Sequence, residues 1–266
     1  MKRRVAAGVL VASVWACAAA SQAMASTTVY GEFDPRFGDF YGVSVIGSPE
    51  PDHVSTALVA GGQVAITDPA GVFTRSPRVC AKITRTTVLC ELGGNSVYVR
   101  LGPGDDSARL HHPTERYGRS YVQTGGGDDR VTVEVGDSEI KAGAGDDVIA
   151  AGAGKDEILG RTGDDRIDGG GGEDRVTGGV GDDRLAGGAG DDRLEGKAGA
   201  DWYEGGPGAD LLRAAEGAID KAIDCGAGAT DYAFIDRGES RLHRNCETWA
   251  VVTGEDVPPG VHQLEP

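Results

Sequence analysis

Aromatic residues are scarce in this 266-residue chain, where Phe, Trp and Tyr together make up 6%. A conventional globular core over the whole length is therefore not expected. The sequence also lacks an HExxH zinc motif and a GxSxG nucleophile elbow, which argues against a metalloprotease or a lipase. Basic residues are also fewer than acidic ones. The formal net charge of −16 argues against a nucleic-acid partner and favours cations.

Long apolar runs are absent except for one near the N-terminus. "MKRR" precedes "VAAGVLVASVWACAAA", and "AMA" before Ser26 fits a small-x-small cleavage site. We therefore expect residues 1–25 to be a secretory signal peptide and not a membrane span. A lipoprotein signal with Cys17 as the lipidated residue is the alternative, although Trp15 two positions earlier fits it poorly.

Four cysteines remain once the signal peptide is set aside, namely Cys80, Cys90, Cys225 and Cys246. Four cysteines allow three pairings, and an oxidising destination favours disulfides. Local pairing, Cys80 with Cys90 and Cys225 with Cys246, is the simplest choice. "VCAKITRTTVLCEL" alternates and is rich in β-branched residues, which predicts two strands with a turn near Arg85. A zinc site is the alternative, but neither pair has the CxxC spacing of such sites.

Glycine is abundant, at 44 residues, and much of it belongs to a repeat of nine. From residue 142 to 213 the chain divides into eight nonapeptides without a gap. The fourth position is always glycine: Gly145, Gly154, Gly163, Gly172, Gly181, Gly190, Gly199 and Gly208. The sixth is always aspartate: Asp147, Asp156, Asp165, Asp174, Asp183, Asp192, Asp201 and Asp210. The eighth is always apolar: Ile149, Ile158, Ile167, Val176, Leu185, Leu194, Tyr203 and Leu212.

The pattern extends upstream less regularly. Gly127, Asp129 and Val131 are in phase, whereas Ser138 stands where the next aspartate belongs. The whole pattern, GGxGxDxUx, resembles the RTX, or hemolysin-type, calcium-binding repeats. The resemblance implies an all-β fold, a parallel β-roll in which a six-residue turn alternates with a three-residue strand and two repeats complete each coil. It also implies Ca²⁺ between turns on the same side, held by the sixth-position carboxylates and by carbonyls of the glycine-rich turns.

Elementary energetics agree with this resemblance. Each 18-residue coil would bury only two apolar side chains, too little to offset the entropy of ordering its backbone. Same-side aspartates such as Asp165 and Asp183 would lie about 4.8 Å apart and repel by about 1 kcal/mol even in water. A divalent cation reverses the sign of that interaction, and Ca²⁺ accepts six to eight oxygens, carbonyls included. Glycine allows the positive φ angles that such turns require.

Counting same-side neighbours gives about seven calcium sites. The pairs are Asp129–Asp147, Asp147–Asp165, Asp165–Asp183, Asp183–Asp201, Asp156–Asp174, Asp174–Asp192 and Asp192–Asp210. The acids at the fifth position, Asp146, Asp164, Glu173, Asp182 and Asp191, are second choices because the family offers the carbonyl there more often than the side chain. Arginines at the seventh position are expected to face outward and offset nearby acids.

The segments on either side of the repeats are predicted to cap the roll. Residues 26–100 are expected to form a β-rich N-terminal cap, and residues 101–213 the roll. "GPGDD" at 102–106 is repeat-like, but Asp106 lies 23 residues before Asp129, so an inserted loop or irregular coil is expected between them. Residues 214–249 resemble the closing segment of actinobacterial secreted proteins of this class, which implies the Cys225–Cys246 pair. Asp231 falls one residue out of phase, which puts calcium binding there in doubt. Residues 250–266 are expected to be a flexible tail.

Three classes of function fit these features. The first is a stand-alone secreted calcium-binding solenoid, extracellular or attached to the cell surface, without catalysis, nucleic acid or membrane span. The second is a calcium-dependent accessory module of a secreted hydrolase. The third is an adhesin-like or toxin-like RTX protein. We favour the first, because the N-terminal region is too short and too strand-rich for the catalytic domains of RTX enzymes, and because exported toxins of the family generally use a C-terminal signal.

Overall fold

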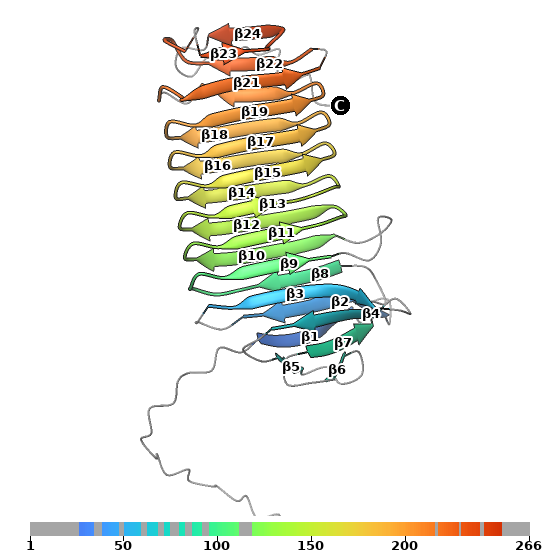
Figure 1. The fold of residues 1–266 in the computed structure, drawn as a ribbon. Helices are drawn as coiled ribbons and strands as arrows, with labels where there is room; N and C mark the ends of the chain where they lie inside the picture. Colours follow the sequence, from blue (N-terminus) through green and yellow to red (C-terminus); the bar gives the residue numbers. More distant parts are fainter. Residues whose placement is uncertain are drawn as a thin grey trace, which may run out of the picture.

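The chain folds into a straight two-sheet rod in the computed structural model (Figure 1). The structure describes residues 27–34, 39–47, 51–59, 63–68, 72–74, 80–82, 87–91, 96–111, 119–215, 218–228, 230–239 and 242–251. All the secondary structure in these ranges is β. Nowhere in them is there a helix of the length and apolarity that a bilayer crossing requires.

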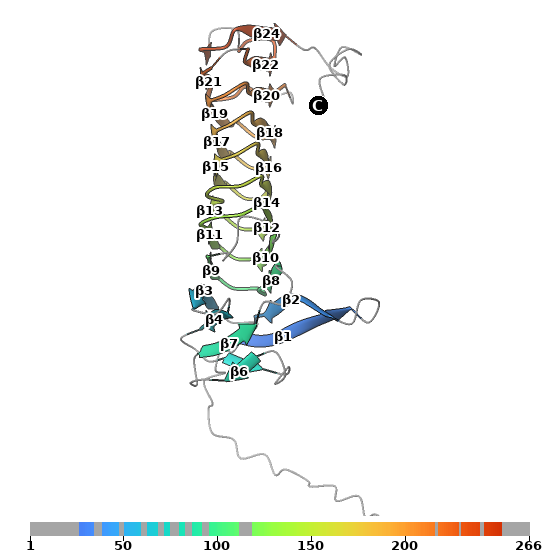
Figure 2. The same cartoon turned by 90° about the vertical axis from the view of Figure 1, so that its right-hand side faces the viewer.

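Two sheets form the long faces of the rod, and successive coils add one strand to each (Figure 2). The first sheet contains, in spatial order, β5 (Val72–Thr74), β1 (Thr27–Asp34), β2 (Asp39–Ile46), β8 (Ser96–Arg100), β10 (Ser120–Gly126), β12 (Ser138–Ala144), β14 (Glu157–Thr162), β16 (Arg175–Val180), β18 (Arg193–Ala198), β20 (Leu211–Ala214), β22 (Tyr232–Ile235) and β24 (Thr248–Val251). The second contains β6 (Cys80–Lys82), β7 (Thr87–Glu91), β4 (Gln63–Thr67), β3 (His53–Val59), β9 (Ser107–Leu110), β11 (Arg130–Val133), β13 (Val148–Ala150), β15 (Arg166–Gly171), β17 (Arg184–Ala189), β19 (Trp202–Pro207), β21 (Ala222–Ala227) and β23 (His243–Arg244).

The register of the roll is 18 residues, as the repeat predicts. Ile158 of β14 pairs with Val176 of β16, and Ile167 of β15 pairs with Leu185 of β17, all in parallel. Two nonapeptides therefore complete one coil, and the parallel β-roll is confirmed. Because side chains alternate along a strand, the eighth position of every repeat points between the sheets.

A single narrow core runs the length of the rod. The eighth-position side chains are all buried and belong to one continuous apolar cluster that extends from Val45 to Ile235. In the regular repeats, residues 142–213, only one large apolar side chain per nonapeptide enters this cluster, so the core there is a row and not a layer several side chains deep. Stability must therefore come largely from what joins one coil to the next.

The sheets continue into the N-terminal strands with a change of direction. β2 pairs with β8 and β3 pairs with β9 in parallel, which adds one more layer to the roll. Beyond it, β1 pairs with β2 and β4 pairs with β3 in antiparallel fashion. β6 and β7 are antiparallel too, with Cys80 directly opposite Cys90. This register allows the predicted Cys80–Cys90 disulfide, which stays a prediction because these side chains lie outside the described ones.

Candidate metal centre

The sixth-position aspartates form two columns, one along each turn edge of the rod. Turns that lead from the first sheet to the second carry the first aspartate column: Asp106, Asp129, Asp147, Asp165, Asp183, Asp201 and Asp220. Turns that lead back carry the second aspartate column: Asp156, Asp174, Asp192, Asp210 and Asp231, preceded by Ser138. Every one of these aspartates is buried, with at most 3% of its surface exposed. The columns therefore hold stacked carboxylates out of water.

One oxygen of each carboxylate is used to join adjacent coils. In the roll, Oδ1 of each aspartate accepts a hydrogen bond from the backbone N–H of the residue one coil earlier in the same column. Asp147 N–H donates to Asp165 Oδ1 at 2.9 Å, and Asp165 N–H donates to Asp183 Oδ1 at 2.8 Å. In the second aspartate column, Asp174 N–H donates to Asp192 Oδ1 at 2.8 Å. Each column is thus a relay of hydrogen bonds that crosses every coil boundary.

The other carboxylate oxygen is buried without any hydrogen-bond donor. This holds for Oδ2 of Asp129, Asp147, Asp156, Asp165, Asp174, Asp183, Asp192, Asp201, Asp210, Asp220 and Asp231. A buried acceptor without a donor costs about 1–3 kcal/mol, and more when it is charged. A series of such oxygens in register is therefore unfavourable unless protons or cations neutralise them.

The first position is glycine in six of the eight regular repeats, where it keeps the space beside Oδ2 open, and alanine in the other two, at Ala142 and Ala151. A Cβ on Gly160 would overlap Asp165 Oδ2 and would lie 2.8 Å from the carbonyl oxygen of Gly178 in the next coil. A Cβ on Gly187 would likewise lie 2.5 Å from Asp192 Oδ2. A carboxylate oxygen and a backbone carbonyl oxygen therefore face the same space between two coils. Such a set of acceptors suits a hard cation that prefers oxygen ligands.

Burial raises the pKa of the column carboxyls, although the backbone hydrogen bonds partly oppose it. The pKa rises to about 7 for Asp147, Asp183 and Asp192. It rises to about 6 for Asp165 and Asp174. Neighbouring acids contribute further increases at these positions. Near neutral pH the carboxyls are thus poised between a proton and a metal ion, since either one neutralises the buried charge.

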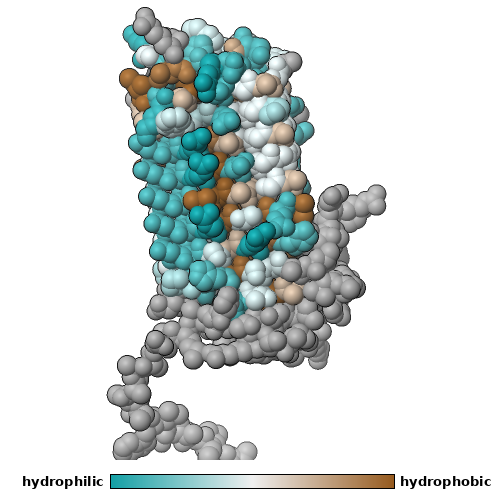
Figure 3. Space-filling model, in the orientation of Figure 1, coloured by the Kyte–Doolittle hydropathy of each residue, from teal (hydrophilic) through white to brown (hydrophobic). Residues whose placement is uncertain are grey.

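Fifth-position acids occupy a different environment, although they are next to the columns in sequence. Asp146, Asp164 and Asp182 are exposed, or nearly so, on the outside of the turns. Asp164 N–H donates to Asp146 Oδ1 and Asp182 N–H donates to Asp164 Oδ1, both at 2.8 Å. This outer row therefore points toward the following coil, opposite to the inner columns. Figure 3 shows a hydrophilic stripe along one turn edge of the rod.

The predicted turn glycines have the backbone conformation that the repeat requires. Gly145, Gly154, Gly163, Gly172, Gly181, Gly190, Gly199 and Gly208 all have φ between 122° and 157°. Arg161 and Lys197, which replace the second glycine, also have positive φ, at 93° and 82°. Non-glycine residues at such angles are strained, so the stacked turns impose the conformation on them.

Several column residues were missed or doubted from sequence. Asp106 does belong to the first aspartate column, because Asp106 N–H donates to Asp129 Oδ1 at 2.8 Å. Despite the 23-residue spacing, β8 pairs with β10 and β9 pairs with β11 in parallel, so the described strands on both sides stay in register. Asp106 differs from the others in that its Oδ2 accepts an N–H from Gly102 at 3.3 Å. The repeat-like sequence "GPGDD" at residues 102–106 was the signal that could have placed Asp106 in the column.

Beyond the repeats, each column continues by one aspartate and then ends on a glutamate. Asp201 N–H donates to Asp220 Oδ1 at 2.8 Å, and Asp220 N–H donates to Glu239 Oε1 at 2.6 Å. Asp210 N–H donates to Asp231 Oδ1, and Asp231 N–H donates to Glu247. The spacings of 16 to 21 residues hide these acids from a search for a period of 18.

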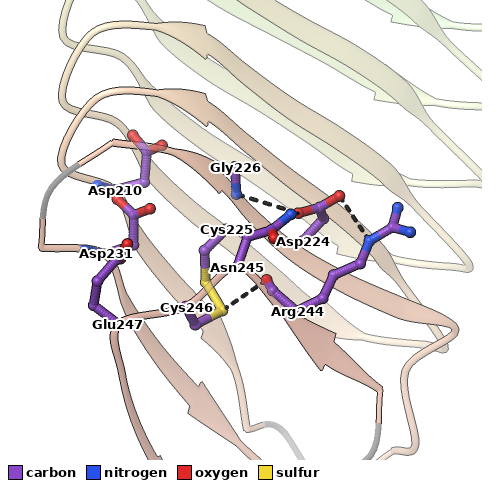
Figure 4. The surroundings of a disulfide bond; sticks show 9 residues. All are labelled: Asp210, Asp224, Cys225, Gly226, Asp231, Arg244, Asn245, Cys246 and Glu247. Atoms are coloured by element: carbon purple, nitrogen blue, oxygen red, sulfur yellow. Dashed lines mark hydrogen bonds and ion pairs between the residues drawn. A yellow bond between two sulfur atoms is a disulfide. The ribbon is translucent and has the colours of Figure 1, made fainter.

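The predicted Cys225–Cys246 disulfide is present at this end of the rod (Figure 4). It joins β21 to the turn that precedes β24. Beside it, Asp224 pairs with Arg244 at 2.7 Å and accepts a hydrogen bond from Asn245. The last two coils are thus held together covalently and by polar contacts.

Comparison with known sequences agrees with the geometry. Residues 123–158, 151–185 and 177–212 match the RTX calcium-binding nonapeptide repeat (4 copies). These segments cover the coils in which the 18-residue register is most regular. Neither the curated proteins nor the solved structures include one that matches this chain.

Proposed function

We propose that this chain, whose residues 123–212 are RTX calcium-binding nonapeptide repeats, is a secreted, non-catalytic protein whose roll folds around Ca²⁺. The observation that carries the proposal is that eleven Oδ2 atoms, in the two aspartate columns, are buried without hydrogen-bond donors. Ca²⁺ bound at these oxygens supplies positive charge and accepts oxygen ligands from two successive coils at once. The chain contributes carboxylates and carbonyls that only a stacked turn brings together.

The donor set favours calcium over zinc. Among the described residues, no group of three or more His, Cys, Asp or Glu side chains could hold a metal by side chains alone. What the turns offer instead is a carboxylate oxygen of one coil beside a backbone carbonyl oxygen of the next, as with Asp165 Oδ2 and the Gly178 carbonyl. Zinc sites in proteins use nitrogen and sulfur ligands in tetrahedral sets, whereas calcium accepts carbonyl oxygens in larger, looser shells.

The regular register supports about seven ions, one for each of the seven same-side pairs between Asp129 and Asp210. Each pair joins two turns whose backbones stack at an 18-residue spacing. Ser138 offers no carboxylate, so the position it shares with Asp156 is expected to bind weakly.

Folding coupled to calcium is the central test. Residues 26–266 are expected to gain β-structure in circular dichroism when Ca²⁺ is added to the millimolar range, and to lose it in chelator. Mg²⁺ at the same concentration serves as the control and should produce a smaller change, because it demands octahedral geometry and dehydrates reluctantly. An identical spectrum in calcium and in chelator would contradict the proposed role of the ion.

Secretion has an independent test. The N-terminal signal is expected to be removed after Ala25, and the exported protein should contain two intramolecular disulfides. Mass spectrometry of that protein checks both the N-terminus and the Cys80–Cys90 pair. A free thiol at Cys80 or an intact N-terminus would contradict export by this route.

A further inference from the structure

Asp231 lies one coil beyond the matched repeats, in a turn that is one residue too long. The first half of this turn nevertheless stacks on the preceding turn as the regular repeats do. Gly226 pairs with Gly206, and Gly208 N–H donates to the carbonyl of Ala227 at 3.3 Å. Thr230, the residue before Asp231, has a positive φ of 89°.

Asp231 has both features that mark the aspartates of the roll. Its Oδ1 accepts the backbone N–H of Asp210 at 2.8 Å. Its Oδ2 is buried without a hydrogen-bond donor, and the side chain as a whole is fully buried. Asp210 Oδ2 is likewise buried without a donor. The lengthened turn has therefore kept the carboxylate in place, and has kept its unpaired oxygen as well.

The unpaired Oδ2 atom is found at the C-terminal end of the column that contains Asp231 but not at Asp106, near the N-terminal end of the rod. Asp106 occupies an equivalent column position, but its second oxygen accepts the N–H of Gly102. A protein donor has thus taken up the second oxygen at the N-terminal end. At Asp231 no described donor does so.

The coil that follows Asp231 holds it in position. Asp231 N–H donates to Glu247 Oε2 at 2.9 Å. The Cys225–Cys246 disulfide joins the first residue of the lengthened turn to the residue immediately before Glu247 (Figure 4). The closing glutamate is therefore tied to the same turn that carries Asp231.

We propose that Asp210 and Asp231 hold a further Ca²⁺ ion between the last regular coil and the cap, outside the matched repeats. This inference rests on the proposed function and adds one site to the seven that the regular register supports. The site is built without a GGxGxD motif, from a turn in which Cys225 takes the place of the first glycine. Ala142 and Ala151 already place a Cβ at this position in the Asp147 and Asp156 turns, whose Oδ2 atoms are likewise buried without donors.

Calcium stoichiometry of the full chain tests the proposal. Asp231→Asn keeps an oxygen that can accept the Asp210 N–H but places an amide donor at the position of Oδ2. The variant is expected to bind one ion fewer than the wild type in equilibrium dialysis, with unchanged circular dichroism in calcium. Asp224→Asn removes an acid from the same coil that pairs with Arg244 and lies outside the columns, so it should bind the wild-type number.

Each outcome separates the two proposals. Equal stoichiometry and affinity in wild type and Asp231→Asn would overturn the cap site and leave the calcium-dependent roll intact. Absence of calcium binding by the wild type would overturn the proposed function itself. If Asp231→Asn does not fold, Asp231→Ser replaces it, because Ser138 already occupies a buried position of the same column. The serine variant should also bind one ion fewer.

Discussion

Replacing Asp183 by alanine is expected to destabilise the calcium-loaded roll far more than replacing Asp182, its neighbour in sequence. Asp183 is fully buried, its Oδ1 accepts the Asp165 N–H, and its Oδ2 has no protein donor. Asp182 is exposed, where it accepts the Ala200 N–H and pairs with Lys221 at 2.7 Å. The two substitutions remove the same charge from different places.

The magnitude for Asp183→Ala follows from two losses. Leaving the buried Asp165 N–H without its acceptor costs about 1–3 kcal/mol. Asp183 also takes part in two same-side pairs, and a site held at 100 times its Kd contributes about 2.7 kcal/mol. Loss of both sites and of the hydrogen bond amounts to roughly 6–8 kcal/mol, comparable with the whole stability of many domains. Asp182→Ala loses only solvent-exposed contacts, so its effect should be small.

Urea unfolding in saturating calcium measures the difference. Asp183→Asn keeps an acceptor for the Asp165 N–H but removes a buried negative charge, so its effect on stability should have opposite signs with and without calcium. It should destabilise the roll in calcium, yet stabilise it in chelator above neutral pH, where the charge of Asp183 has no counterion. Equal losses for Asp182→Ala and Asp183→Ala would refute the reasoning, since bulk acidity and not the register would then bind the ion.

Three further outcomes are expected from the same geometry. Burial raises the folded pKa of Asp165 to about 6 and that of Asp183 to about 7, above the unfolded value, so the calcium-free roll should be more structured near pH 4 than near pH 8, while the folded roll should bind calcium more tightly near pH 8. Circular dichroism without calcium checks the first direction and calcium titration at the two pH values checks the second, and a calcium affinity independent of pH would count against proton competition. Gly178→Ala should raise the calcium midpoint only modestly, because its Cβ would overlap Asp183 Oδ2 and that carboxylate must shift, but the roll already accepts a Cβ at the same repeat position in Ala142 and Ala151. Gly171→Ala, whose Cβ would meet only a carbonyl at 3.8 Å, should leave the midpoint unchanged. Reduction of Cys225–Cys246, which closes a 21-residue span, should cost about 3 kcal/mol in urea unfolding, and no change would show that polar contacts alone hold the cap.

Sequence periodicity predicted the part of the fold in which every unit has the same length. The columns from Asp147 to Asp210 and the inward eighth positions follow directly from a period of nine and from strand alternation. Spacing could not show that Asp106 and Asp129 share a column despite their 23-residue spacing, or that a turn one residue longer leaves Asp231 in its column. Insertions within a turn change the count along the chain while the backbone stacking, which fixes the geometry, is preserved.

The sequence also could not show which backbone N–H each carboxylate accepts. Aspartates at the fifth and sixth positions are identical in chemistry and adjacent in the chain. Their hydrogen bonds run in opposite directions along the rod, toward the following coil for Asp164 and toward the preceding coil for Asp165. Only the path of the stacked backbone decides which of the two carboxylates is enclosed and which one faces water.

Because successive strands alternate between the two sheets, the number of nonapeptides determines how the two ends of the rod are rotated relative to each other. A gain or loss of 18 residues within the regular coils would lengthen or shorten the rod by about 4.8 Å and leave its two ends in the same mutual orientation. A gain or loss of nine would turn everything downstream by half a revolution about the long axis, because each later strand would join the opposite sheet. The number of repeats, odd or even, therefore sets the direction in which the disulfide-closed end faces relative to the N-terminal strands. The chain can change length in whole coils without disturbing that alignment.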